Sequence, residues 1–233
     1  MCPNWTRIAT TSDTLIHSFL QFLNLSLQEI KNFQLMKSKK IKRKFDSLDE
    51  LVDFYINNIT LPLKKELEET KEIILFPENK DQEKARALLR NAHQKHLIWR
   101  KEAYDKVVSK LMDAKHWNNN YKDFEDLYEN VEETIHNFKY VGDLTVFDVA
   151  KRIGNAIGIQ PKEFVYLSRG AKQGAEILLG ERIKEKRLPV EKFRKYFPSL
   201  SPIHIENILC IMKEYFIKDG IDITKEYELK IYN

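Results

Sequence analysis

Apolar residues recur at spacings of three and four along most of the chain, which is the period of an amphipathic α-helix. Ser47 and Glu50 have the spacing of a capping box and predict that a helix starts between them. Pro62 suits the first turn of another helix. The helices predicted in this way cover residues 15–35, 48–56, 62–72 and 121–138.

Residues 81–114 contain neither Gly nor Pro, and their apolar side chains form one stripe with helical spacing. Leu88, Trp99 and Leu111 lie on this stripe. A helix of this length extends about 50 Å at 1.5 Å per residue. We therefore predict one long central helix.

The composition changes at residue 139, because six of the seven glycines lie between Gly142 and Gly180. The tail, residues 221–233, alternates apolar and charged side chains and predicts a lone strand or an extended arm. The other elements predicted in this part are short helices at residues 146–157, 161–167, 171–179, 189–196 and 202–218.

These elements predict an all-α protein, because no set of strands exists that could form a substantial sheet. We expect a multi-helix bundle with one long central helix and a compact, Gly-containing C-terminal helical part. The boundary falls between a helical part at residues 1–138 and a second part at residues 139–233. These are two domains or one continuous domain; the pattern does not distinguish the two.

Composition adds limits to this picture. The chain has 233 residues, and 42% of them are hydrophobic, a fraction high enough to exclude general disorder. Its formal net charge of +4 is small. Its two cysteines, Cys2 and Cys210, form no C-x-x-C pair, which excludes a Cys-rich zinc module. Lone cysteines suit a reducing compartment, and no apolar stretch is long enough to span a membrane. We expect a cytoplasmic protein without membrane, metal or cofactor.

The segment 139–180 carries the most information. Thr145 and Asp148 have the spacing of an N-terminal helix cap, and Gly142 before them permits a tight turn. A helix N-terminus behind a glycine turn is a potential anion site. A plain alternative is that the glycines let helices pack closely or end.

This segment resembles helix-hairpin-helix DNA-binding elements, in which a Gly-hydrophobic-Gly turn holds a phosphate through backbone N–H groups. Tyr140 stands here in the place of the first glycine, and Gly142 in that of the second. The run from Gly142 to Gly174 also resembles a group of uncharacterised bacterial proteins, which implies a bacterial source and no activity. The nucleic-acid-binding residues that we expect are Lys139, Tyr140, Gly142, Thr145, Lys151, Arg152, Arg169 and Lys172.

Other candidate sites have plainer explanations. Ser168 precedes a basic Gly-flanked turn that could bind phosphate, but helix capping is favoured. His93 and His96 stand one helical turn apart without an evident third metal ligand. Cys210 lies in an apolar run and is typical of a buried side chain. The basic run at residues 37–44 could contact phosphates, but a solvated helix end or a connector is favoured. The carboxylates of residues 123–129 predict a solvated acidic face rather than a nuclease metal site.

We expect a protein that binds nucleic acid through the phosphate backbone, without sequence preference. The first alternative is a protein–protein interaction subunit of a bacterial complex, or a homo-oligomer. The second is an enzyme like the helix-hairpin-helix DNA glycosylases, which are all-α and of similar size. No Asp occurs between Asp148 and Asp219, where those enzymes carry their acid, so no catalytic residue is assigned.

Overall fold

The computed structural model describes residues 38–89 and 100–232, which are mainly helical. The chain divides into two compact units, residues 1–41 with 229–233, and residues 42–228. Strand β1 (Ser38–Arg43) pairs with strand β6 (Tyr227–Tyr232) in a two-stranded sheet. The tail therefore forms a strand, but this strand is paired with β1 and is not the lone strand that was one of the two predicted alternatives. The basic run is a strand, where we expected a helix end or a connector.

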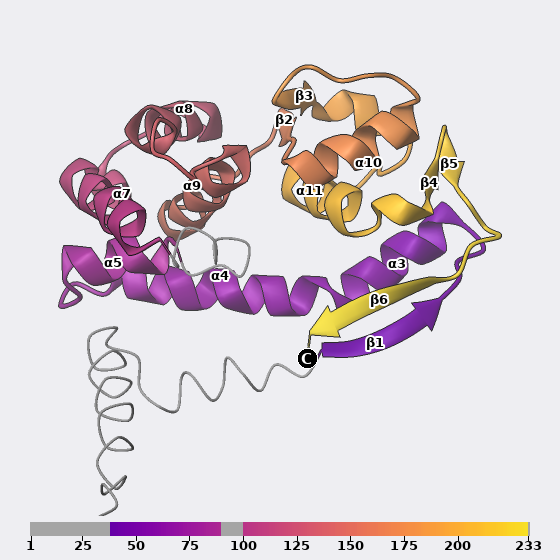
Figure 1. Cartoon of the computed structure of the whole chain (residues 1–233), viewed down its shortest axis with the longest axis horizontal. Helices are drawn as coiled ribbons and strands as arrows, with labels where there is room; N and C mark the ends of the chain where they lie inside the picture. Colours follow the sequence, from indigo (N-terminus) through magenta and orange to yellow (C-terminus); the bar gives the residue numbers. More distant parts are fainter. Residues whose placement is uncertain (1–37, 90–99, 233) are drawn as a thin grey trace, which may run out of the picture. The chain divides into compact units, whose positions relative to one another are not determined.

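The unit of residues 42–228 contains the remaining elements (Figure 1). Its α-helices are α3 (Leu48–Asn58), α4 (Thr60–Leu75), α5 (Asp81–Ala87), α7 (Lys101–Ala114), α8 (Phe124–Ile135), α9 (Asp143–Ile157), α10 (Arg169–Leu179) and α11 (Pro202–Ile211). Its 3-10 helices are η2 (His116–Asn118), η3 (Val190–Phe193) and η4 (Lys213–Tyr215). Its strands form two antiparallel pairs, β2 (Phe164–Tyr166) with β3 (Arg187–Pro189), and β4 (Phe216–Ile217) with β5 (Gly220–Ile221).

Helix α3 begins where the capping pattern predicts. The side chain of Ser47 accepts a hydrogen bond of 3.1 Å from the backbone N–H of Glu50. The Glu50 carboxylate accepts one of 2.9 Å from the N–H of Asp46 and contacts Arg43 at 2.9 Å. These contacts, with the Asp46 N–H first, lower the pKa of Glu50. The cap fixes the start of the helix that buries Leu51.

The predicted long helix over residues 81–114 is wrong. Helix α5 ends at Ala87 and α7 begins at Lys101, while residues 90–99 lie outside the described chain. The Nζ of Lys115, just after α7, lies 2.7 Å from an Oδ of Asp81 at the start of α5. A straight helix would hold these residues about 50 Å apart. The apolar stripe instead folds back and packs against itself, which buries Leu88 and Leu111 together in one core.

One hydrophobic core joins these helices to the segment after residue 138. Buried side chains of α5, α7, α8 and α9 form a single cluster, with Ile74 of α4 and Tyr166 of β2. Its buried side chains include Leu89, Val107, Phe124, Val131, Phe147 and Ile153. Residues on both sides of position 138 therefore belong to one compact unit.

Glycines let α10 and α11 approach closely. A Cβ at Gly174 would lie 2.0 Å from the backbone oxygen of Leu209, and one at Gly170 would lie 2.5 Å from Sγ of Cys210. Gly158 and Gly180 end α9 and α10 with positive φ angles of 81° and 65°. The packing and capping roles proposed for the glycines are thus correct.

Three of the short predicted helices differ from the structure. Residues 161–167 contain strand β2, and residues 189–196 contain the 3-10 helix η3. The helix predicted over residues 202–218 ends at Ile211, and η4 and β4 follow it. Across residues 38–89 and 100–232, no helix is both long and apolar enough to cross a membrane.

Candidate functional site

A short turn between α8 and α9 contains the residues on which the sequence resemblance rests. The two helices pack side by side, and residues 136–142 connect them (Figure 1). Tyr140 adopts φ = +73°, the left-handed conformation that glycine favours. It does so at the position where helix-hairpin-helix turns carry their first glycine. Side-chain identity differs from the motif, but the backbone conformation that glycine usually supplies is present.

The N-terminus of α9 opens at this turn. Gly142 is the N-cap residue, and its carbonyl accepts hydrogen bonds from the N–H groups of Thr145 and Val146 at 2.9 and 3.1 Å. A Cβ at Gly142 would meet nothing within 4 Å, so a ligand can approach the backbone here. The N–H groups of the first turn carry the positive end of the helix dipole, which favours an anion.

Two cations flank the turn. The guanidinium carbon of Arg100 lies 5.3 Å from the ring centroid of Tyr140, and Nζ of Lys139 lies 5.2 Å from it. Arg100, Lys139 and Tyr140 are all exposed. The turn therefore presents two positive charges and one aromatic ring beside the helix N-terminus, and Arg100 is a contributor that sequence reasoning missed.

Thr145 does not cap α9. It is the third residue of the helix and is only 3% exposed. The capping interpretation placed the helix start too late, because Gly142 provides the N-cap without a side-chain hydrogen bond. Thr145 is therefore not available for contact with a phosphate.

Lys151 and Arg152 are also wrong as phosphate contacts. Arg152 is 1% exposed, forms an ion pair with Glu66 of α4, and donates a 2.9 Å hydrogen bond from Nη1 to the carbonyl of Leu88. Lys151 is buried as well, and its Nζ lies 3.0 Å from Oδ1 of Asp148. Helix α9 is largely enclosed, so Arg152 links it to α4 and to Leu88, whereas Lys151 pairs within the helix, and neither side chain faces solvent.

Ser168 caps α10, as expected. Its hydroxyl accepts a hydrogen bond from the N–H of Ala171 at 3.4 Å. Arg169 is exposed at the first position of the helix, while Nζ of Lys172 donates to the carbonyl of Lys184 at 3.1 Å. Among the described residues, no hydrogen bond or ion pair joins Arg169 or Lys172 to the hairpin turn. The structure therefore does not bring all the predicted cations together.

A buried polar cluster was not foreseen. Asp148 and Lys151 of α9 pair with each other, and Ser168 donates a 2.7 Å hydrogen bond to Oε1 of Glu206 on α11. Burial raises the pKa of Glu206 to about 7, against the lowering effects of Lys151 and Ser168. Burial also raises the pKa of the Cys210 thiol, which makes it a poor nucleophile. The sequence contains one signal of this cluster, because Glu206 is the single acidic residue inside the apolar run of residues 202–212.

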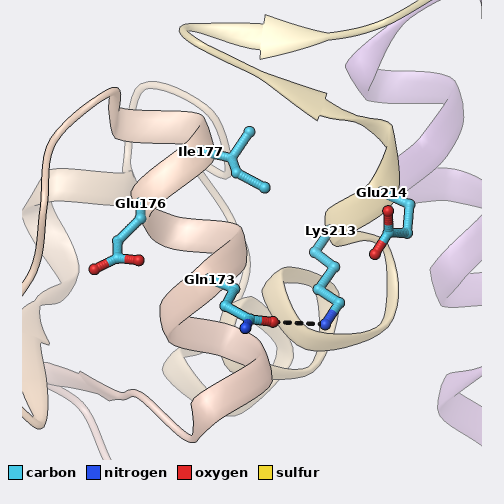
Figure 2. Close-up of a pocket in the computed structure, with 5 residues that line it drawn as sticks. All are labelled: Gln173, Glu176, Ile177, Lys213 and Glu214. Carbon is cyan, nitrogen blue, oxygen red and sulfur yellow. Dashed lines mark hydrogen bonds between the residues drawn. The ribbon is translucent and has the colours of Figure 1, made fainter.

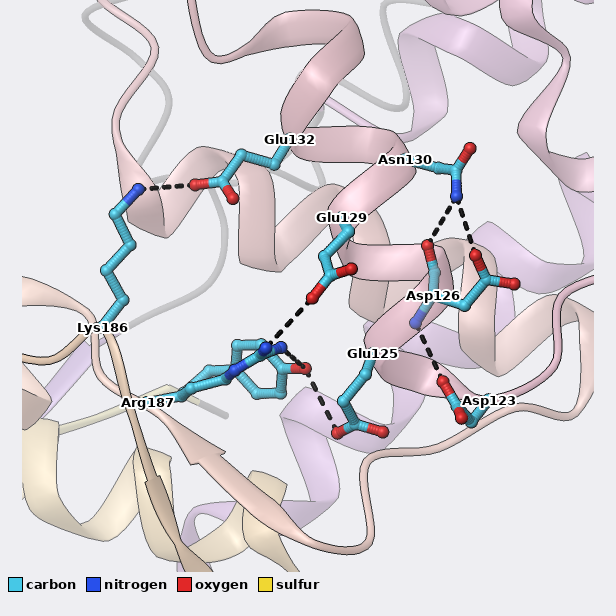
Figure 3. Close-up of polar contacts among 9 residues, drawn as sticks. Asp123, Glu125, Asp126, Glu129, Asn130, Glu132, Lys186 and Arg187 are labelled. Atoms are coloured by element: carbon cyan, nitrogen blue, oxygen red, sulfur yellow. Dashed lines mark hydrogen bonds and ion pairs between the residues drawn. The ribbon is translucent and has the colours of Figure 1, made fainter.

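The carboxylates of α8 are largely engaged (Figure 3). The side chain of Asp123 caps the helix by accepting a 2.9 Å hydrogen bond from the N–H of Asp126. Glu129 pairs with Arg187 of β3 at 3.0 Å, and Glu125 accepts a 3.3 Å hydrogen bond from the hydroxyl of Tyr166. The acidic face is partly solvated, as expected, and it also attaches α8 to the β2–β3 pair. The two histidines at positions 93 and 96 lie outside the described residues.

A shallow pocket of about 340 Å³ lies between α10 and η4 (Figure 2). Nζ of Lys213 donates a 2.8 Å hydrogen bond to Oε1 of Gln173 across it. Its other lining residues are Glu176, Ile177 and Glu214. Neither Glu206 nor Cys210 lines this pocket, so the buried cluster and the pocket are separate features.

Comparisons with known protein families, with curated proteins and with solved structures found no match. The functional argument therefore rests on the residues of this chain.

Proposed function

We propose that the protein binds the phosphate backbone of nucleic acid, without sequence preference, at the α8–α9 hairpin turn. The observation that carries this proposal is the left-handed Tyr140 in the turn that leads to the open helix N-cap at Gly142. Such a turn aims backbone N–H groups outward, and these groups suit the oxygens of a phosphate.

The flanking side chains add to the binding. Arg100 and Lys139 supply charge to a phosphate next to the one held by the turn. The ring of Tyr140 is 37% exposed and lies beside both cations, and we propose that an unpaired base stacks against its exposed part. Within the described chain, no group near the turn is placed to read base edges in a groove, so binding depends little on sequence.

Acidic groups beside the turn limit the affinity. Asp143 is the first residue of α9, and its Oδ1 lies 3.3 Å from Nζ of Lys186. The ammonium group of Lys186 offsets part of the negative charge of Asp143. Two cations at the turn correspond to a slope of log affinity against log salt of about −2 for a duplex. We therefore expect weak binding that falls as salt rises.

Fluorescence anisotropy tests the proposal with a labelled 20-base-pair duplex and its single strand, at low and moderate salt. The full chain is compared with Arg100→Glu/Lys139→Glu. A matched control is Lys64→Glu/Lys65→Glu, which reverses two exposed charges on α4. Salt-sensitive binding that is lost in the first variant and kept in the control supports the turn. No binding at low salt, or equal loss in both variants, overturns it.

A protein-binding surface is the second candidate function. Leu75 and Phe76, at the end of α4, are each more than half exposed and line a second pocket of about 450 Å³ with Pro77. Exposed large apolar side chains that adjoin one another are typical of interaction sites. Light scattering of the purified chain across a concentration series tests self-association, and Leu75→Glu/Phe76→Glu should abolish any oligomer formed through this surface.

A further inference from the structure

Three side chains of the kinds that bind metal ions converge at the base of the α8–α9 hairpin. Glu132 and His136 stand one turn apart at the end of α8, and Asp143 opens α9. One ligand atom of each lies within 4.8 Å of the other two. Nε2 of His136 lies 3.7 Å from Oδ1 of Asp143. Two carboxylates and an imidazole from two helices thus surround a common point.

A cation already lies in this cluster. Nζ of Lys186 is 2.6 Å from Oε1 of Glu132 (Figure 3) and 3.3 Å from Oδ1 of Asp143. The backbone of Lys186 is held at this place, because its carbonyl accepts a 2.7 Å hydrogen bond from the N–H of Leu167. The side chain of Lys186 is nevertheless 49% exposed, so its ammonium group can turn into water without unfolding the strand pair.

We infer that Glu132, His136 and Asp143 form a site for a divalent transition metal ion of the Zn²⁺ class, and that Lys186 is its built-in competitor. Carboxylate oxygens and a neutral imidazole nitrogen are ligands that Zn²⁺ accepts, and three protein ligands leave a fourth position for water. Tetrahedral bonds of about 2 Å place ligand atoms about 3.4 Å apart. The three side chains are partly exposed and can rotate over the remaining distance.

Exchange of the ammonium for a metal changes the charge at the hairpin. The metal brings two positive charges where Lys186 brings one, and it ties the end of α8 to the start of α9. Both effects favour an anion at the N-terminus of α9. This gain in nucleic-acid affinity rests on the proposed function, whereas the binding of the metal does not.

Isothermal titration of the full chain with zinc chloride, without nucleic acid, tests the site. Other histidines, including His93 and His96, can also bind zinc. The variants therefore identify which zinc equivalent binds at the proposed site. We expect His136→Ala to bind one equivalent less than the unaltered chain. We expect Lys186→Met to bind that equivalent at least about tenfold more tightly, because no ammonium has to leave.

The control is Lys192→Met, which removes a lysine paired with Glu181 at 2.8 Å outside the cluster. It should leave zinc affinity unchanged. Equal stoichiometry in His136→Ala and the unaltered chain, or no tightening in Lys186→Met, overturns the site. Since this titration contains no nucleic acid, its failure is distinct from a failure of the proposed function. Circular dichroism of each variant verifies that it is folded.

Discussion

The hydroxyl of Ser168 donates a 2.7 Å hydrogen bond to the carboxyl group of Glu206, and both side chains are buried. The same serine caps α10, so the start of this helix is linked to α11 through one acid. The charges of Asp148 and Lys151 act on Glu206, and the charge of Glu206 acts in turn on Cys210 and Tyr55. Lys151 is already paired with Asp148, and among residues 38–89 and 100–232 no ion pair gives an ionised Glu206 a cation of its own.

Stability should therefore fall as pH rises from about 4.5 through about 7. The folded-state pKa of Glu206 is raised to about 7 from an ordinary value of 4.5, so the folded chain holds the proton more tightly than the unfolded chain. The stabilisation is complete below the unfolded-state pKa of 4.5 and is lost as the pH rises above the folded-state pKa of about 7. Its size is on the order of 3 kcal/mol, because one pKa unit corresponds to about 1.4 kcal/mol. Urea unfolding at pH 5, 6, 7 and 8 measures it.

Glu206→Gln should flatten this part of the pH profile, because an amide keeps the shape of the side chain and does not ionise. Glu181→Gln is the control, since Glu181 is an exposed acid paired with Lys192 at the surface. A profile of Glu206→Gln that still falls as steeply as that of the unaltered chain would show that another group causes the loss.

Arg152→Met should destabilise the protein by about 2–4 kcal/mol. The change leaves the buried carbonyl of Leu88 without its hydrogen bond and Glu66 without its partner. Lys139→Met removes an exposed cation and should shift stability by less than about 0.5 kcal/mol. Chemical denaturation of both variants measures the difference, and similar values would contradict a structural role for Arg152. Charge reversal at Arg152 is for the same reason unsuitable as a test of nucleic-acid binding.

Gly174→Ala should separate α10 from α11. The new methyl group would lie 2.0 Å from the backbone oxygen of Leu209, which is too close for any contact, and backbone cannot move aside as a side chain can. Overpacking of this kind costs about 1–3 kcal/mol or more. Gly220→Ala is the matched control, since a Cβ there meets nothing within 4 Å. Thermal unfolding should show a lower midpoint for the first variant alone.

Local signals in the sequence located several elements, and long-range packing decided the rest. The Ser47 cap marked the start of α3, and the glycine turn marked the hairpin, because both depend on neighbouring residues. Strand β2 has three residues, too few for a period to be visible. The burial of Arg152 was hidden because its partners, Glu66 and Leu88, lie 86 and 64 positions away in the sequence. An enclosed helix with two adjacent cations, Lys151 and Arg152, looks locally like a helix with an exposed basic face.

The turn itself can be tested through the conformation of Tyr140. At φ = +73° every residue with a Cβ is strained, by about 1 kcal/mol, whereas glycine is not. Both Tyr140→Gly and Tyr140→Ala remove the ring, so their difference isolates the backbone. We expect the glycine variant to be more stable than the alanine variant. At ordinary backbone angles the alanine variant is the more stable one, because glycine gives the unfolded chain more conformational entropy. In anisotropy measurements, both variants should lose affinity for the single strand, because the stacking face is gone. Both variants should keep most of the duplex binding, because Arg100, Lys139 and the N–H groups at the start of α9 remain. An alanine variant that is more stable than the glycine variant would mean that Tyr140 does not adopt the left-handed conformation on which the phosphate proposal depends.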